Sequence, residues 1–159
     1  MEGRSVIRLV VSIIICQAAG LAGSLFNFAS IPTWYATVNK PFFNPPNWVF
    51  APAWTTLFLL MGISLYLIWD KGLGSKGVRK GVYIFGIQLG LNVLWSALFF
   101  GLRSPPLAFI EIVALWIAIL LTIRAFIPIS KRAAWLLVPY ITWVSFAAIL
   151  NLSIWALNP

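Results

Sequence analysis

The sequence has 159 residues, of which 62% are hydrophobic and 9% are charged, and its mean hydropathy is +0.97. These values are typical of a single integral membrane domain and argue against a soluble globular protein. The formal net charge of +8 raises the question of a nucleic-acid partner. However, the basic residues lie in short junctions between apolar runs, which is typical of topology signals and lipid headgroup contacts, so we exclude nucleic acid.

Five apolar runs are each long enough to cross a bilayer, which needs about 20 residues. We therefore predict an all-α integral membrane protein, a five-helix transmembrane bundle that forms one domain over residues 1–159. The predicted spans are about 6–28, 47–69, 80–101, 105–124 and 131–158. The first run follows Arg4 and Arg8 like a signal peptide, but it is too long for one and no polar domain follows it. We expect a retained helix.

One side of the first span carries small and polar residues. Gln17, Gly20, Ser24 and Asn27 recur at intervals of three and four residues, which places them on one helical face. In hydrocarbon such a stripe is expected to face other helices and not lipid.

The segment from Trp34 to Trp54 follows the first span and combines aromatic residues with prolines. Pro41, Pro45, Pro46 and Pro52 disfavour a continuous helix. Its aromatic residues are too apolar for a flexible aqueous linker; they are Trp34, Tyr35, Phe42, Phe43, Trp48 and Phe50. Two interpretations stay open. The segment forms an interfacial aromatic belt, or it forms a lid that closes one end of the bundle over a ligand.

The third span has two contrasting faces. At 100° per residue, Gln88, Asn92, Trp95 and Phe99 fall within about 60° of one another, with Ser96 just beyond. Gly86 and Gly90 form a GxxxG pair on roughly the opposite side, which favours close contact with another helix, inside the molecule or in a second copy. We predict that the polar and aromatic face points into the bundle, where the amides of Gln88 and Asn92 would orient a ligand.

The last span should kink at Pro139, which cannot bond to the carbonyl four residues earlier. Trp143, Ala147 and Asn151 then stack at intervals of four residues, with Tyr140 on the same side. Tryptophans in the middle of a span, such as Trp95 and Trp143, are not explained by an interfacial belt. They are candidates for a buried aromatic wall.

The sequence offers little for ordinary catalysis. It contains no histidine, and its one cysteine, Cys16, lies in an apolar run, so we predict no metal site and no catalytic residues. Glu111 lies one to two turns into the fourth span. It is either a functional intramembrane carboxylate or an interfacial one, where solvation or Arg103 would suffice.

The basic residues are distributed unevenly between the two sides of the predicted bundle. The N-terminus and the second and fourth loops carry nine of them, and the remaining junctions carry only Lys40 and Arg103. The nine are Arg4, Arg8, Lys71, Lys76, Arg79, Lys80, Arg124, Lys131 and Arg132. The positive-inside rule places the N-terminus in the cytoplasm and the proline-rich loop on the opposite side.

Taken together, three groups of residues resemble one family. The first loop reads Trp34-Tyr35, Lys40-Pro41, Pro45-Pro46, Phe50, Pro52 and Trp54; the third span has Gln88, Asn92, Trp95-Ser96 and Phe99-Phe100; the last has Pro139-Tyr140, Trp143, Phe146-Ala147 and Leu150-Asn151. This pattern, which covers nearly the whole chain, resembles the TspO family, the tryptophan-rich sensory proteins related to the mitochondrial translocator protein or peripheral benzodiazepine receptor.

The resemblance implies a pocket under the first loop that binds porphyrins such as protoporphyrin IX and haem, and benzodiazepine-type ligands. The matching positions are Tyr35, Trp54, Phe58, Asn92, Trp95, Ser96, Trp143 and Ala147. It also implies a homodimer through the third span, at Gly86 and Gly90, and a prokaryotic cell membrane as the location. The C-terminal Tyr–Lys/Arg cholesterol pattern of vertebrate relatives is missing here.

The expected function is therefore a membrane receptor or sensor that regulates tetrapyrrole or stress responses, with no obligatory cofactor. The alternatives are a transporter of porphyrin or a small apolar ligand, and a protein that degrades porphyrin with light and oxygen through its pocket tryptophans. Only this last route would make the protein an enzyme.

Overall fold

The computed structural model describes residues 2–159, and every regular element in this range is helical. The five long helices are α1 (Glu2–Ser30), α3 (Phe50–Trp69), α4 (Lys76–Ser96), α5 (Pro105–Phe126) and α7 (Val138–Leu157). The short elements are α2 (Trp34–Thr37), the 3₁₀ turn η1 (Asn47–Val49), the π-helical turn η2 (Ala97–Gly101) and α6 (Lys131–Leu136).

The predicted fold class is confirmed. With the short elements joined to their neighbours, five helical stretches are long and apolar enough to cross a membrane. These stretches are Gly3–Ser30, Asn47–Trp69, Lys76–Gly101, Pro105–Phe126 and Lys131–Leu157. The third begins four residues before the predicted boundary, because residues 76–80, which include Lys76, Arg79 and Lys80, continue the helix beyond its apolar part.

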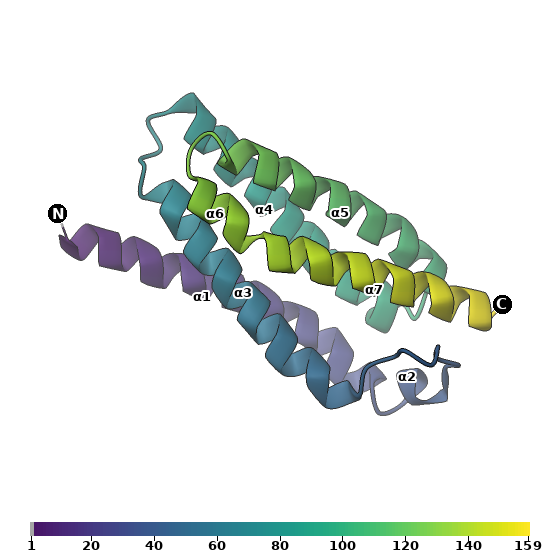
Figure 1. Cartoon of the computed structure of the whole chain (residues 1–159). Helices are drawn as coiled ribbons and strands as arrows, with labels where there is room; N and C mark the ends of the chain where they lie inside the picture. Colours follow the sequence, from purple (N-terminus) through teal and green to yellow (C-terminus); the bar gives the residue numbers. More distant parts are fainter. Residues whose placement is uncertain (1) are drawn as a thin grey trace.

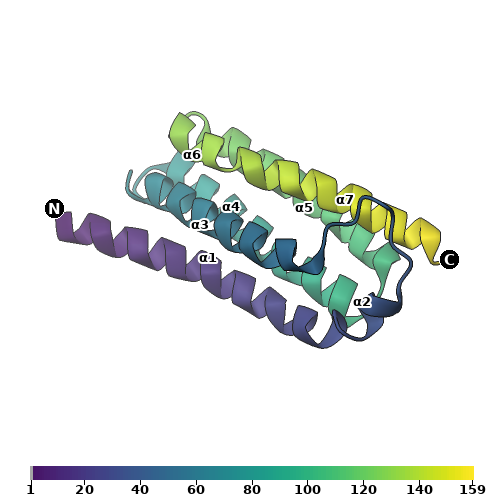
Figure 2. The same ribbon diagram turned by 60° about the horizontal axis from the view of Figure 1, so that its bottom comes forward.

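The long helices run roughly along one another and give the molecule two distinct ends (Figure 1). The N-terminus, the α3–α4 connector and the α5–α6 connector lie at one end, while α2 and the C-terminus lie at the other (Figures 1 and 2). The first end therefore collects the nine basic residues counted above.

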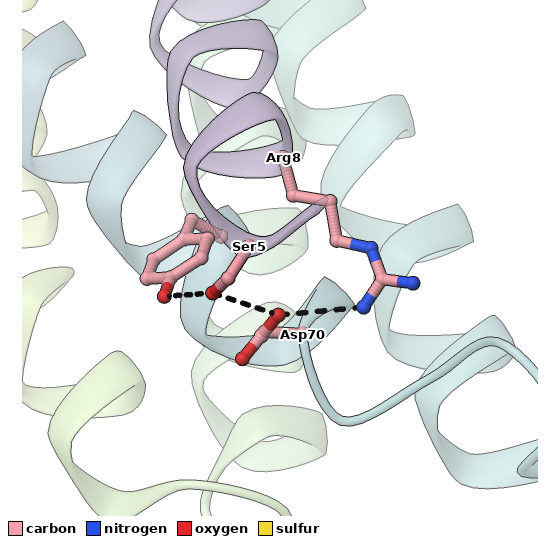
Figure 3. Close-up of polar contacts among 4 residues, drawn as sticks. Ser5, Arg8 and Asp70 are labelled. Atoms are coloured by element: carbon pink, nitrogen blue, oxygen red, sulfur yellow. Dashed lines mark hydrogen bonds and ion pairs between the residues drawn. The ribbon is translucent and has the colours of Figure 1, made fainter. Parts of the chain in front are cut away.

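The first helix packs tightly along α3. A Cβ atom added to Gly62 would lie 2.7 Å from the Cα atom of Ile13, so only glycine permits this approach of the two backbones. Near the N-terminus, the Ser5 and Tyr66 hydroxyls lie 2.7 Å apart, and Asp70 Oδ1 accepts from Arg8 Nη1 at 3.3 Å (Figure 3). These polar contacts are partly exposed and contribute little, so close packing holds α1 to α3.

The helical path is interrupted at Leu137, between α6 and α7. Pro139 explains the interruption, since it has no N–H to donate to the carbonyl of Trp135 and its ring crowds that turn. The kink expected at this proline is therefore a break between two helices, which redirects α7 along α5.

We predict that Gly62→Ala destabilises the α1–α3 packing by about 1–3 kcal/mol, because the added methyl group meets backbone that cannot move aside. Thermal unfolding in detergent, followed by circular dichroism, should show a melting temperature lower by about 3 °C or more.

Gly77→Ala is the matched control, because that glycine is also helical and its added Cβ would meet only Ser75 Oγ at 3.8 Å. Equal melting temperatures for the two variants would contradict the close approach at Gly62.

Candidate functional site: an aromatic cavity beneath the first loop

The segment between α1 and η1, residues 31–46, is called the lid loop below, and hydrogen bonds hold it in place. The backbone N–H of Asn39 donates to Asn158 Oδ1 at 3.0 Å, and Asn158 Nδ2 donates back to the Asn39 carbonyl at 3.0 Å. Within the loop, the Tyr35 hydroxyl donates to Asn44 Oδ1 at 2.8 Å. The loop is thereby fastened to the C-terminal end of α7. It also contains the short helix α2, although the sequence predicts no regular structure there.

Some aromatic residues of the Trp34–Trp54 segment face outward and others face inward. Phe42 and Trp48 are 101% and 73% exposed and point away from the bundle, as expected for interfacial anchors. Tyr35 is 3% exposed and, like Phe50, lines a cavity below the loop.

This cavity has a volume of about 500 Å³ and is bounded by α1, α3, α4, η2, α7 and the lid loop. Eight of the nine predicted ligand-binding residues line it: Tyr35, Trp54, Phe58, Asn92, Trp95, Ser96, Trp143 and Ala147. Its size lies in the range of small-molecule sites in proteins.

Gln88, the ninth, lies outside the cavity lining and is 1% exposed. Its Oε1 atom accepts from the Tyr140 hydroxyl at 3.0 Å, and that hydroxyl accepts from Asn92 Nδ2 at 2.9 Å. Tyr140 therefore fills the space beside Gln88, and the two amides expected to orient a ligand are joined to each other through this phenol. The ring geometry of Tyr140 could not be read from helical periodicity.

Aromatic rings border the cavity in two separate clusters. The first, called the α3–α7 cluster, contains Phe50, Trp54, Phe58 and Trp143; its Trp54 and Trp143 rings are 6.5 Å apart and nearly perpendicular. The second, called the α4–lid cluster, contains Tyr35, Trp95, Phe99 and Phe100; its Trp95 and Phe99 rings stack at 5.1 Å. Among residues 2–159, no ring pair joins the two clusters, so the cavity lies where they would otherwise meet.

The π-helical turn η2 brings two consecutive phenylalanines to the cavity. Its wider ring is closed by the Leu102 N–H, which donates to the Ala97 carbonyl five residues earlier at 2.8 Å. Phe99 and Phe100 both line the cavity, and the Ser30 hydroxyl donates to the Phe100 carbonyl. Such turns are rare in proteins as a whole, and many of those that occur lie at functional sites. Nothing in the sequence pattern indicates this one.

The small and polar stripe of α1 also lines the cavity, which sequence reasoning missed. Gln17, Gly20, Ser24 and Asn27 face it, so the stripe that was expected to face other helices faces the space between them. A Cβ atom on Gly20 would lie 2.6 Å from the Phe58 ring, so glycine lets α1 approach this ring. The Oδ1 atom of Asn27 is buried and has no hydrogen-bond partner.

The cavity lining carries no formal charge among the described residues. A cation contacts one of the lining residues: the Nζ atom of Lys40 lies 4.6 Å from the centre of the Tyr35 ring and donates to the Val38 carbonyl at 3.0 Å. Burial raises the pKa of Tyr35 to about 12, although its hydrogen bond to Asn44 lowers it. The phenol is therefore neutral at physiological pH.

Glu111 has neither the solvation nor the Arg103 partner that the interfacial interpretation offered. Its side chain is 7% exposed, and neither carboxylate oxygen has a hydrogen-bond partner. It belongs to the buried stripe of α5 with Ala108, Ile112 and Leu115, and it does not line the cavity.

The GxxxG pair of α4 faces outward. A Cβ atom on Gly86 or Gly90 would meet nothing within 4 Å, so these glycines do not serve packing within the chain. Tyr83, Ile87 and Leu94 are exposed on the same helix.

Comparison with known proteins agrees with this architecture. Residues 12–156 match the model of the TspO/MBR family. The chain is 48% identical to "Tryptophan-rich protein TspO" of Archaeoglobus fulgidus, over 97% of this chain and 99% of that one. It is 38% identical to "Translocator protein" of Homo sapiens, over 86% and 81%, and 32% identical to "Tryptophan-rich sensory protein" of Cereibacter sphaeroides, over 90% and 86%.

Proposed function

The chain belongs to the TspO/MBR family, and we propose that it is a membrane receptor for flat, largely apolar ligands, with protoporphyrin IX as the first candidate. Binding in the cavity beneath the lid loop would regulate a tetrapyrrole or stress response. The membrane location follows from the family and from the five apolar helices.

The observation that carries this proposal is the pair of separate aromatic clusters on the cavity. A flat macrocycle placed between them would stack on Trp95 from α4 and meet Trp54 and Trp143 from α3 and α7. Aromatic stacking and apolar burial are the main sources of affinity in such a site. The same surfaces suit benzodiazepine-type ligands, which are aromatic and carry few charges.

The propionates of a porphyrin would need a cation, and the lining supplies none. Lys40 is the candidate, because its Nζ atom lies over the ring of Tyr35, and Tyr35 lines the cavity. We therefore orient the ligand with its propionates toward the lid loop. Arg103, the other cation expected at this end, is exposed on the α4–α5 turn.

Haem fits the lining less well than the metal-free porphyrin. The chain has no histidine, neither Cys16 nor Met61 lines the cavity, and Tyr35 is a neutral phenol bonded to Asn44. None of these supplies a strong axial ligand to iron. The chain's own residues would bind either compound by stacking.

The distribution of basic residues supports an orientation. The end that holds the N-terminus carries nine basic residues, so this end lies in the cytoplasm by the positive-inside rule, in a prokaryotic cell membrane. The lid loop then lies on the opposite side.

A homodimer through α4 completes the proposal. Gly86 and Gly90 leave a smooth strip beside exposed Tyr83 and Ile87, and small residues of this kind let two membrane helices approach closely. The strip lies on the outer face of α4, away from the cavity-lining Asn92 and Ser96.

Titration with protoporphyrin IX in the dark should quench tryptophan fluorescence in a saturable way. Trp54→Phe and Trp143→Phe should each raise the dissociation constant by about 2- to 10-fold, because each removes part of an aromatic contact.

Trp135→Phe is the matched control, since Trp135 is 71% exposed on α6 and does not line the cavity. Linear quenching that ignores all three substitutions would mean that the porphyrin only partitions into the detergent, and the proposed receptor function would be wrong.

Gly90→Leu should lower the yield of cross-linked dimer in liposomes, because its side chain holds the two α4 helices apart. Ala114→Leu adds the same side chain at an exposed position of α5 and should leave the yield unchanged. An undiminished dimer in the Gly90 variant would remove α4 from the interface.

A further inference from the structure

We propose that ligands enter and leave the cavity sideways from the hydrocarbon of the bilayer, through an opening between α1 and α3, and not from water through the lid loop. This inference rests on the proposed function, because it concerns the route to the same cavity. The gap between these two helices is called the lateral opening below.

The exposed part of the cavity lining lies on one side. Six lining residues are exposed, and all belong to α1, the start of the lid loop, η1 or α3: Leu21, Phe28, Pro32, Asn47, Ala51 and Thr55. By contrast, every lining residue of α4, η2 and α7 is buried or half-buried, and Tyr35 under the lid is buried. The cavity is therefore closed toward α4, α7 and Tyr35 and open between α1 and α3.

The exposed residues of the two helices lie at matching levels. Gly62 contacts Ile13, and the helices are antiparallel, so a step toward the lid on α1 corresponds to an equal step back along α3. This register puts Leu21 at the level of Trp54, one residue from Thr55, and Phe28 at the level of Asn47. Leu21 and Phe28 are 68% and 78% exposed. They form one rim of a continuous slot, and Ala51 and Thr55 belong to the other.

The slot reaches into the hydrocarbon. The 29 residues of α1 span about 43 Å, so a helix centred in the bilayer extends beyond both sides of a hydrocarbon core of about 30 Å. Leu21 is then about 7 Å from the midplane and Phe28 about 18 Å from it. The lateral opening therefore runs from the interfacial region into the acyl chains, where a membrane-dissolved ligand resides.

Among the described residues, one hydrogen bond ties the two rims of the slot, and it lies at the deep end of the slot, at Thr55. Gln17 Nε2 donates to the Thr55 carbonyl at 3.1 Å, and among the described residues this is the last hydrogen bond between α1 and α3 on the way to the lid end. Beyond it, Ser30 bonds to Phe100 in η2 and not to α3. In Figure 2 the ribbons of α1 and α3 lie further apart toward α2.

The hydroxyl groups along the rims are already satisfied within their own helices. Ser24 Oγ donates to the Leu21 carbonyl at 2.7 Å, and Thr55 Oγ1 donates to the Ala51 carbonyl at 2.8 Å. A ligand can thus pass between α1 and α3 without breaking a hydrogen bond. Passage through the lid loop would instead break the paired contacts between Asn39 and Asn158.

The test compares exchange rates in lipid nanodiscs by stopped-flow fluorescence, with protoporphyrin IX as the probe. Thr55→Phe narrows the lateral opening and should slow association by about tenfold, because the added ring obstructs the route between α1 and α3. Thr56→Phe is the control: this neighbouring threonine is also exposed and bonded to its own helix, at Pro52 O, but it does not line the cavity.

A second variant locks the lid loop. Asn39→Cys with Asn158→Cys, in a Cys16→Ala background and oxidised to a disulfide, should exchange the porphyrin at the rate of its reduced form. Slower exchange after oxidation would overturn the proposal, as would equal rates for the Thr55 and Thr56 variants.

A second measurement tests the lateral opening without a bound porphyrin. If the wild type shows no saturable binding, the proposed function fails, and the opening is then tested with phospholipids brominated in the middle of an acyl chain. Acyl chains that enter the slot should quench the cavity tryptophans more in Thr56→Phe than in Thr55→Phe. Equal quenching in the two variants would show that the slot is closed to the bilayer.

Discussion

The bilayer offers no water to polar groups, and this constraint determines where almost every polar side chain of the bundle lies. Trp95 Nε1 donates to Asn151 Oδ1 at 3.2 Å, and Asn151 Nδ2 donates to the Pro105 carbonyl at 2.8 Å, which joins α4, α7 and the start of α5. Ser64 and Gln17 bond to backbone carbonyls of neighbouring helices in the same way. Interhelical bonds of this kind are worth about 0.6–2 kcal/mol each, so they fix the register of helices that small residues allow to pack.

The same constraint explains the character of the cavity. Because Asn92 and Asn151 already bond to protein groups, most of the amides near the cavity are not free to select a ligand, and the aromatic rings dominate its surface. Asn27 Oδ1, on the α1 side, is buried without a hydrogen-bond partner. Recognition by stacking and shape is tolerant of ligand chemistry, and the proposed binding of both porphyrins and aromatic drugs depends on this tolerance. Glu111 and Gln88 Nε2 are further buried groups without protein partners, and the cavity does not account for either.

The lengths and hydropathy of the apolar runs were enough to predict the five-helix fold, whereas the eight predicted residues that line the cavity were identified as a set through the resemblance to the TspO family. Trp95 and Trp143 could be identified as candidates for a buried aromatic wall, because an interfacial belt does not explain a tryptophan in the middle of a span. Gln88 was expected to line the cavity because it shares a helical face with Asn92. Its side chain instead lies against Tyr140, which belongs to a different helix. Phe100 was missed because the π-helical turn changes the periodicity on which the prediction relied. The role of the α1 stripe depends on the space between helices, which no local pattern encodes.

The most direct measurement is a structure of the protein in lipid with protoporphyrin IX bound, prepared in the dark. The account predicts a flat ligand between the two aromatic clusters, in contact with Trp95 and Trp143, its propionates toward Lys40 and one edge at the slot between Leu21 and Thr55. A porphyrin found on the outer surface of the bundle, with the cavity occupied by neither ligand nor acyl chain, would contradict it.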